Sequence, residues 1–95
     1  MVTHIVVFKW SAVVTRDQID AFGRELDQMA AHFIETATIC HGPDLAFREG
    51  NGDYALVATF ADETAWRAYQ SHPRHQAFVR DFVTPIQASR LTIQF

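Results

Sequence analysis

The sequence predicts a single α+β domain, residues 1–95, in which strands and helices follow one another in the order β-α-β-β-α-β. Two observations lead to this prediction. Apolar residues recur with helical spacing in two segments, and four other segments are rich in β-branched and aromatic residues and are bounded by turn residues. A chain of 95 residues is long enough to bury one core and too short for two domains.

The first half of the chain is predicted to form a strand, a helix and a strand. Residues 2–10 carry the β-branched and aromatic pattern of a strand. Thr15 and Gln18 form a capping-box pattern at the start of a helix, and Glu25 lies off its apolar stripe. That stripe is formed by residues with 3-4-3-4 spacing: Ile19, Phe22, Leu26, Met29 and Phe33. Residues 36–41 are predicted to be a strand closed by a turn at Gly42-Pro43.

The second half is predicted to form a strand, an interrupted helix and a strand. Residues 49–53 are turn residues and residues 54–60 a strand. Asp62 is a good N-cap for a helix that Ser71-His72-Pro73 interrupts; its second piece runs to about Val83. Residues 90–95 form the last strand. This order is that of ferredoxin-like folds, whose two helices cover one face of a four-stranded antiparallel sheet.

Both faces of the predicted sheet are apolar. In the strand 54–60 we assign Tyr54, Leu56, Ala58 and Phe60 to the helix side, yet the opposite set of Ala55, Val57 and Thr59 is also largely apolar. The first strand shows the same alternation between two largely apolar sets. These are His4, Val6, Phe8 and Trp10 on one side and Ile5, Val7 and Lys9 on the other. A face without a helix normally carries polar residues. We therefore expect a homodimer that buries the second face, as in a dimeric α/β-barrel; the alternative is a monomer with scattered exposed apolar residues.

The composition excludes several classes of partner. The formal net charge is −3, Lys9 is the only lysine, and the arginines are scattered, so neither nucleic acid nor an anionic membrane is an expected partner. Cys40 is the only cysteine, which rules out an internal disulfide and favours a reducing, cytoplasmic location. We expect Cys40 to be a small apolar filler in its strand. We expect neither a signal peptide nor a membrane span in the first residues, because their apolar run is short and interrupted.

A histidine and a tyrosine on the interrupted helix are the candidate site residues. His75 lies in the helix's apolar stripe, with Phe78, Val79, Phe82 and Ile86. Tyr69 and Trp66 are expected on the same inward side, and His4 is expected to face them from the sheet. A buried neutral histidine suits a general base. The alternative is a core in which His75 bonds a backbone carbonyl and the hydroxyl of Tyr69 reaches solvent.

The remaining histidines are assigned structural positions. We expect His72 to serve the helix entry, His32 to lie near a helix C-terminus and His41 to lie on the surface at a strand end. His72 and His75 lack a nearby third ligand, so no metal site is predicted. No cofactor motif is present, because the sequence Gly50-Asn51-Gly52 lies between strands, in a hairpin context.

Several segments together resemble the stress-responsive A/B-barrel (Dabb) domain family. They are the opening His4-Ile5-Val6-Val7-Phe8-Lys9, the turn Gly42-Pro43-Asp44, the strand 54–60 and the run from Tyr69 to Val79 with its His72-Pro73-Arg74-His75 core. The resemblance covers the whole chain. It implies the ferredoxin-like fold, a dimeric α/β-barrel and, in plant members, a link to stress. The resemblance also leaves open a divalent ion at the dimer interface, but nothing in this sequence marks ligands for it.

The resemblance also implies residue roles, by similarity to a plant polyketide cyclase of that family that closes its substrate by an aldol condensation. His75 would remove the acidic proton between two carbonyls, Tyr69 would stabilise the enolate, and His4 would orient the substrate. Tyr54 replaces a pocket histidine of the cyclase; with Trp66 and Phe78 it would shape the substrate pocket. The alternatives are a non-enzymatic stress or binding protein and a cofactor-free monooxygenase or isomerase.

Overall fold

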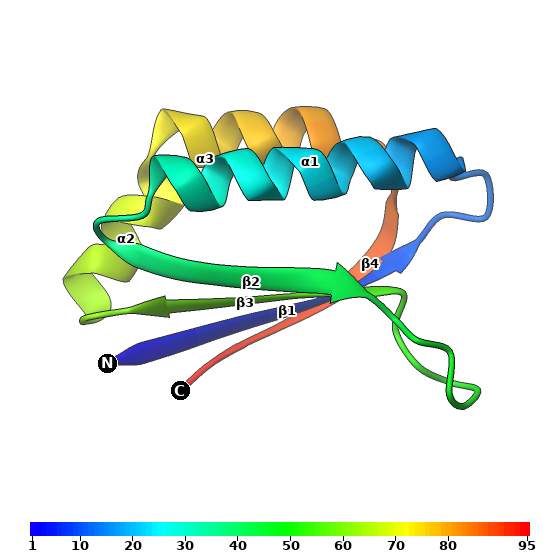
Figure 1. The fold of residues 1–95 in the computed structure, drawn as a ribbon, viewed down its shortest axis with the longest axis horizontal. Helices are drawn as coiled ribbons and strands as arrows, with labels where there is room; N and C mark the ends of the chain where they lie inside the picture. The colour runs from blue at the N-terminus through cyan, green and yellow to red at the C-terminus, as the bar shows by residue number, and fades with distance from the viewer.

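The computed structural model describes residues 1–95 and confirms the predicted order of elements. A four-stranded antiparallel sheet has the strand order β2-β3-β1-β4. Its strands are β1 (Val2–Trp10), β2 (Ala37–Pro43), β3 (Tyr54–Phe60) and β4 (Gln87–Gln94). All helices lie on one face of this sheet, and the other face carries none (Figure 1). No helix is both long and apolar enough to cross a membrane.

The first helix, α1 (Arg16–His32), begins as the sequence predicts. The backbone N–H of Gln18 donates to Thr15 Oγ1 at 3.1 Å, and the Thr15 N–H donates back to Gln18 Oε1 at 2.9 Å. This reciprocal pair satisfies two N–H groups that have no partner within the helix. Glu25, expected off the apolar stripe, is nevertheless buried, because its carboxylate accepts from Arg74 Nη1 at 2.7 Å. That ion pair ties α1 to the segment that carries His75.

The edge strands differ in extent from the prediction. β2 does not turn at Gly42-Pro43, because Gly42 pairs with Ala55 and Pro43 with Tyr54. Pro43 is tolerated there since β2 is an edge strand, whose outward N–H groups need no partner in the sheet. β4 begins at Gln87, three residues earlier than predicted, and a register shift between Lys9 and Trp10 lets it pair with the end of β1.

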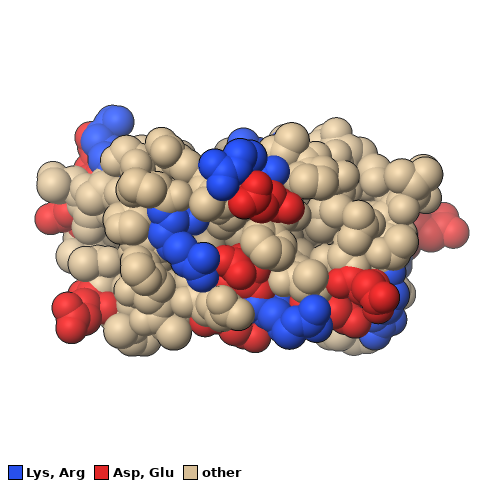
Figure 2. All heavy atoms as spheres, turned by 90° about the horizontal axis from the view of Figure 1, so that it is seen from above, with Lys and Arg blue, Asp and Glu red and all other residues tan.

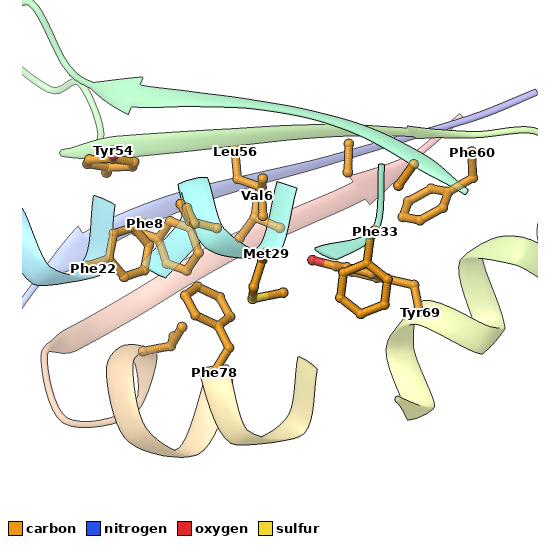
Figure 3. Close-up of a cluster of buried hydrophobic side chains, with 14 of the residues drawn as sticks. Val6, Phe8, Phe22, Met29, Phe33, Tyr54, Leu56, Phe60, Tyr69 and Phe78 are labelled. Atoms are coloured by element: carbon orange, nitrogen blue, oxygen red, sulfur yellow. The ribbon is translucent and has the colours of Figure 1, made fainter. Parts of the chain in front are cut away.

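The core lies between the sheet and the helices and is rich in aromatic rings (Figure 3). Phe22 of α1 stands edge-on to Phe8 and Tyr54, with ring centroids 5.2 and 4.9 Å apart. Aromatic pairs at this separation and angle add to the free energy gained by burying their area. The inward set predicted for β3 is confirmed, since Tyr54, Leu56, Ala58 and Phe60 are all buried.

The second helical segment is divided into three parts: α2 (Glu63–Ser71), α3 (Pro73–Phe78) and the π-helical turn η1 (Val79–Val83). His72 separates the first two. As predicted, it serves the helix entry: its Nδ1 accepts from the N–H of Arg74 at 3.0 Å, and Pro73 occupies the first turn. The predicted stripe changes beyond this point. In η1 the N–H of Thr84 bonds the carbonyl of Val79, which inserts one residue, so Val83 rather than Phe82 is fully buried.

The face without helices is largely apolar, as the sequence predicts. Val7, Leu91 and Ile93 share this outer face, where Val7 pairs with Leu91 and Ile5 with Ile93, and Leu91 is 80% exposed. The loop between β2 and β3 projects to the side opposite the helices (Figure 1). Gly52 passes directly over Val7, where a Cβ would collide with Val7 Cγ1. Cys40 is not a buried filler, because it lies opposite Val57 on this face and is exposed.

Candidate functional site

A cavity of about 240 Å³ lies between β1 and β4 on one side and the segment from α2 to η1 on the other. We call it the inner cavity. Its buried or half-buried walls come from β1, β3 and the helical segment, whereas its exposed residues all come from β4, so it opens at β4. Its lining consists of His4, Val6, Phe8, Leu56, Trp66, Gln70, His75, Phe78, Val79, Val83, Arg90, Thr92 and Gln94.

His75 lines this cavity in its neutral form. Burial lowers the pKa of His75 from 6.5 to about 4. Hydrogen bonding to the Gln70 backbone opposes this shift, and the charges of His4, Arg90 and His72 add to it. At neutral pH the imidazole therefore carries a free lone pair. Its Nδ1 is buried and has no hydrogen-bond partner in the chain. A buried ring nitrogen without a partner is unusual and costs free energy unless something else bonds it.

Tyr69 does not line the inner cavity but lies against His75, with ring centroids 4.5 Å apart. Its side chain is only 2% exposed and its hydroxyl points into the interior rather than reaching solvent (Figure 3). That hydroxyl also has no partner, and neither has Nε2 of neighbouring Gln70. Burial raises the pKa of Tyr69, so its hydroxyl stays protonated and has a proton to donate. Three unbonded polar atoms thus come from residues 69, 70 and 75.

His4 enters the cavity from β1, and its contacts fix its tautomer. Trp66 Nε1 donates to His4 Nδ1 at 3.3 Å, and the Gln94 side-chain amide lies 2.9 Å from the same nitrogen. Because an indole N–H can only donate, Nδ1 is the acceptor and the proton of the neutral ring lies on Nε2. Burial, with Arg90 adding to it, lowers the pKa of His4 and keeps it neutral. His4 is therefore a hydrogen-bond donor within the site.

One wall of the cavity is polar, and the sequence-based prediction did not include it. The register of β4 places Arg90 opposite Phe8, Thr92 opposite Val6 and Gln94 opposite His4. Since residues directly opposite one another in an antiparallel pair point to the same face, these three side chains face the helix side. The sequence does show polar and apolar residues alternating from Arg90 to Phe95. Which of the two sets faces the helices can be decided only once the register of β4 with β1 is known.

Tyr54 lies apart from the other predicted site residues. Whereas His4, Trp66, His75 and Phe78 line the inner cavity, Tyr54 lies at the floor of a second hollow of about 760 Å³, which we call the α1–β2 groove. There the Tyr54 hydroxyl is 2.7 Å from His41 Nδ1, and His41 Nε2 is 2.6 Å from Asp27 Oδ1. His41 is not on the surface as expected, because its side chain is only 12% exposed.

Acidic and basic side chains are interspersed on the helix face, without a continuous patch of either sign (Figure 2). The structure contains no group of three or more His, Cys, Asp or Glu side chains placed to hold a metal ion. His32 and His72 do approach each other, with ring centroids 5.4 Å apart, but no third ligand joins them. The polar groups that line the inner cavity are the imidazoles of His4 and His75, the amides of Gln70 and Gln94, the Thr92 hydroxyl and the Arg90 guanidinium.

Comparison with known proteins agrees with this architecture. The family model described as "Stress responsive A/B Barrel Domain" (Dabb) matches residues 2–95. A dimeric ferredoxin-like protein of unknown function from Thermobifida fusca YX has 36% sequence identity and a TM-score of 0.90, over 99% of this chain and 88% of that chain. A Dabb family protein from Mesorhizobium loti has 22% identity and a TM-score of 0.81, over 99% and 93%.

An enzyme is also among the similar structures. Hydroxynitrile lyase from Passiflora edulis has 19% identity and a TM-score of 0.81, and the alignment covers 99% of this chain and 90% of that chain. At this identity the likeness concerns the fold. A search of curated proteins gives no match.

Proposed function

The chain belongs to the stress responsive A/B barrel domain family, and we propose that it is a homodimer whose inner cavity binds a small enolisable carbonyl compound and exchanges its acidic proton through His75. The observation that carries this proposal is that three of the four buried polar side-chain atoms without partners come together here: Tyr69 Oη, Gln70 Nε2 and His75 Nδ1. Gln70 and His75 line the cavity, and Tyr69 lies directly against His75. Folded proteins leave few such atoms, and a bound molecule with carbonyl oxygens and an acidic C–H would bond all three.

Each residue has a distinct role in this proposal. His75, neutral and free at Nδ1, accepts the proton from the carbon between two carbonyls, and the electron pair of that C–H bond moves onto a carbonyl oxygen. The Tyr69 hydroxyl, which lies next to His75 and outside the lining of the unliganded cavity, donates to that oxygen once substrate is bound and stabilises the enolate. His4, whose Nε2 carries the proton, donates to the second carbonyl and fixes the orientation of the substrate.

The size of the cavity limits the substrate. A cavity of about 150 Å³ accommodates benzene, so about 240 Å³ accommodates a molecule of about ten non-hydrogen atoms. Phe8, Leu56 and Phe78 form its apolar walls and would exclude water from the enolate. A short polyketide-like β-dicarbonyl compound fits this volume, and aldol cyclisation of such a compound would begin with the same proton removal. The fold neighbour from Passiflora edulis is named for lyase chemistry on hydroxynitriles.

The outer face supports the homodimer. Leu91, Ile93 and Phe95 are 80%, 59% and 73% exposed. Leu45 and Phe47 of the β2–β3 loop are exposed too and line a hollow together with Val7 of this face. A second sheet packed on this face would bury it, and a two-fold axis lets identical surfaces cover each other. The Thermobifida fusca relative, at 36% identity, is described as dimeric.

The proton exchange can be tested with ethyl acetoacetate, a neutral β-dicarbonyl compound that fits the cavity. Proton NMR in D2O measures how fast its central hydrogens exchange. We expect the wild-type protein to accelerate the exchange, and Tyr69→Phe to reduce that acceleration by about 10²-fold, the effect of removing one oxyanion donor. Tyr54→Phe, in the α1–β2 groove, is the control that retains full rate. Exchange no faster than in buffer would refute the proposed chemistry and favour a non-enzymatic binding protein.

The assembly is tested by sedimentation. The wild-type protein should sediment at twice the 10.8 kDa of one chain. The double variant Leu91→Asp/Ile93→Asp places two charges on the outer face without touching the core, so it should sediment as a monomer with unchanged helical circular dichroism. A wild-type protein that is monomeric at micromolar concentration would refute the homodimer.

A further inference from the structure

Arg90 is the only charged residue that lines the inner cavity, and no carboxylate neutralises it. Of the seven arginines, four form ion pairs: Arg16, Arg67, Arg74 and Arg80. The lining contains no Asp or Glu. An unpaired guanidinium at the entrance of this cavity can bind an anion, since its planar fork matches the two oxygens of a carboxylate.

The position of Arg90 within the sheet aims it at the site rather than at the dimer surface. It is paired with Phe8, whose side chain is 2% exposed and lies in the core between sheet and helices. The neighbouring Leu91 points to the outer face, with Val7. Arg90 therefore lies at the β4 entrance with its cationic group on the same side of the sheet as His4 and His75.

The positive charge of Arg90 lowers the pKa of both His4 and His75. After burial, Arg90 is the second cause that lowers the pKa of His4, and it also contributes to lowering the pKa of His75. Like charges in one partly enclosed space produce this effect. A carboxylate bound to Arg90 would cancel the effect and make His75 a stronger base, but only while that ligand is present.

We propose that Arg90 determines the specificity of this site, so that the inner cavity selects carbonyl compounds that carry a free carboxylate, with the carboxylate on Arg90 and the enolisable carbon at His75. This inference rests on the proposed function and narrows it to short β-keto acids. Thr92, adjacent to Arg90 on the same wall, supplies a hydroxyl that can donate to the same carboxylate.

Acetoacetate and acetylacetone are the matched probes for this proposal. They have the same shape and the same enolisable carbon, and they differ in that a carboxylate oxygen of the first is a methyl group in the second. Dissociation constants for each come from ligand-observed NMR titration of the full-length protein. Because a charge-assisted hydrogen bond at a partly exposed site accounts for about a tenfold change in affinity, we expect the wild-type protein to bind acetoacetate about tenfold more tightly.

Two substitutions separate the role of Arg90 from a general effect of charge. Arg90→Gln should abolish the preference by weakening acetoacetate binding, while acetylacetone binds as before. Arg48→Gln removes the same charge from the β2–β3 loop, outside the cavity lining, and should retain the tenfold preference. A preference that persists in Arg90→Gln, or equal binding of both probes by the wild-type protein, would overturn the proposal while leaving the proposed function standing. If neither probe binds the wild-type protein, the site itself is refuted, and this proposal with it.

Discussion

The inner cavity and the α1–β2 groove each bring a histidine and a tyrosine together, but they differ in how their polar atoms are bonded. In the groove, Tyr54, His41 and Asp27 form a continuous chain of hydrogen bonds of 2.7 and 2.6 Å. At the cavity, His75 Nδ1 and the hydroxyl of Tyr69, which lies against His75 outside the lining, are both buried and bond nothing. A satisfied network stabilises the fold on its own, whereas an unsatisfied one requires a ligand to complete it.

The difference teaches that burial and residue type alone do not mark a site. The chain Asp27-His41-Tyr54 resembles a proton relay, yet every ring nitrogen in it already has a partner, and it connects α1, β2 and β3. We therefore interpret it as a structural tie and the inner cavity as the place of chemistry. The following predictions test this contrast in pairs of matched variants.

The largest expected effect separates the two histidines. His75→Gln should reduce the protein-catalysed deuterium exchange of ethyl acetoacetate by about 10²–10⁴-fold, the usual contribution of a general base. His41→Gln should leave the rate unchanged, because His41 does not line the inner cavity. Both variants should remain dimers by sedimentation. Equal losses of rate in the two variants would show that the inner cavity and the α1–β2 groove do not differ in the way proposed.

The pH dependence of stability gives the next effect. The pKa of His75 is lowered to about 4 in the folded chain, against 6.5 as the ordinary value. Between these values the unfolded chain binds a proton that the folded chain does not, so the free energy of unfolding falls as the pH drops from 6.5 to 4. His75 is only half-buried, so after a discount for solvent screening we expect about 1–2 kcal/mol.

Urea denaturation at pH 7.5 and pH 5.0 measures this loss of stability. In His75→Gln the loss should be smaller than in the wild-type protein, by the share that His75 contributes. His4, whose pKa is lowered in the same direction, should account for part of the remainder. An unchanged difference between the two pH values in His75→Gln would show that its imidazole is not held neutral.

The two tyrosine-to-phenylalanine variants should change stability in opposite directions. Tyr54→Phe removes the partner of His41 Nδ1 and should destabilise the protein by about 1–2 kcal/mol. Tyr69→Phe removes a buried hydroxyl that bonds nothing and should stabilise the unliganded protein by about 1 kcal/mol. Thermal unfolding of the two variants without ligand measures both changes. Destabilisation by Tyr69→Phe would mean that its hydroxyl has a partner within the fold.

Most of the fold could be predicted from the sequence because its signals are local. The capping box at Thr15 and the alternation along β3 each depend on residues a few positions apart. The exceptions depend on contacts made at long range. Pro43 extends β2 because the strand is at the sheet edge, and the π turn at Val79 replaces Phe82 by Val83 in the core. The spacing of apolar residues in the sequence predicts neither the longer β2 nor the π-helical turn.

The candidate site was predictable only in part, for the same reason. His4, Trp66, His75 and Phe78 were found because each lies on the inward side of its own element. The tie of His41 to Asp27 depends on how α1 lies over β2, and Arg90 enters the site through the register of β4. The absence of partners at Tyr69 and His75 is a property of the packed interior, so no sequence pattern could show it.

The smallest expected effect tests how rigidly the hydrogen bonds of Asp27, His41 and Tyr54 hold the Tyr54 hydroxyl. A Cβ on Gly23 of α1 would lie 3.1 Å from the Tyr54 hydroxyl, which is held by His41 and has little freedom to move. In an exposed helix, Gly→Ala stabilises by about 1 kcal/mol, so here this gain is opposed by the crowded contact and Gly23→Ala should be nearly neutral. In the Tyr54→Phe background the oxygen is gone, and the same change should stabilise the protein by about 0.5–1 kcal/mol. Urea denaturation of the four proteins in this double-mutant cycle measures the coupling. An additive result would show that Tyr54 moves freely, and the groove would then be an adaptable hollow rather than a fixed tie.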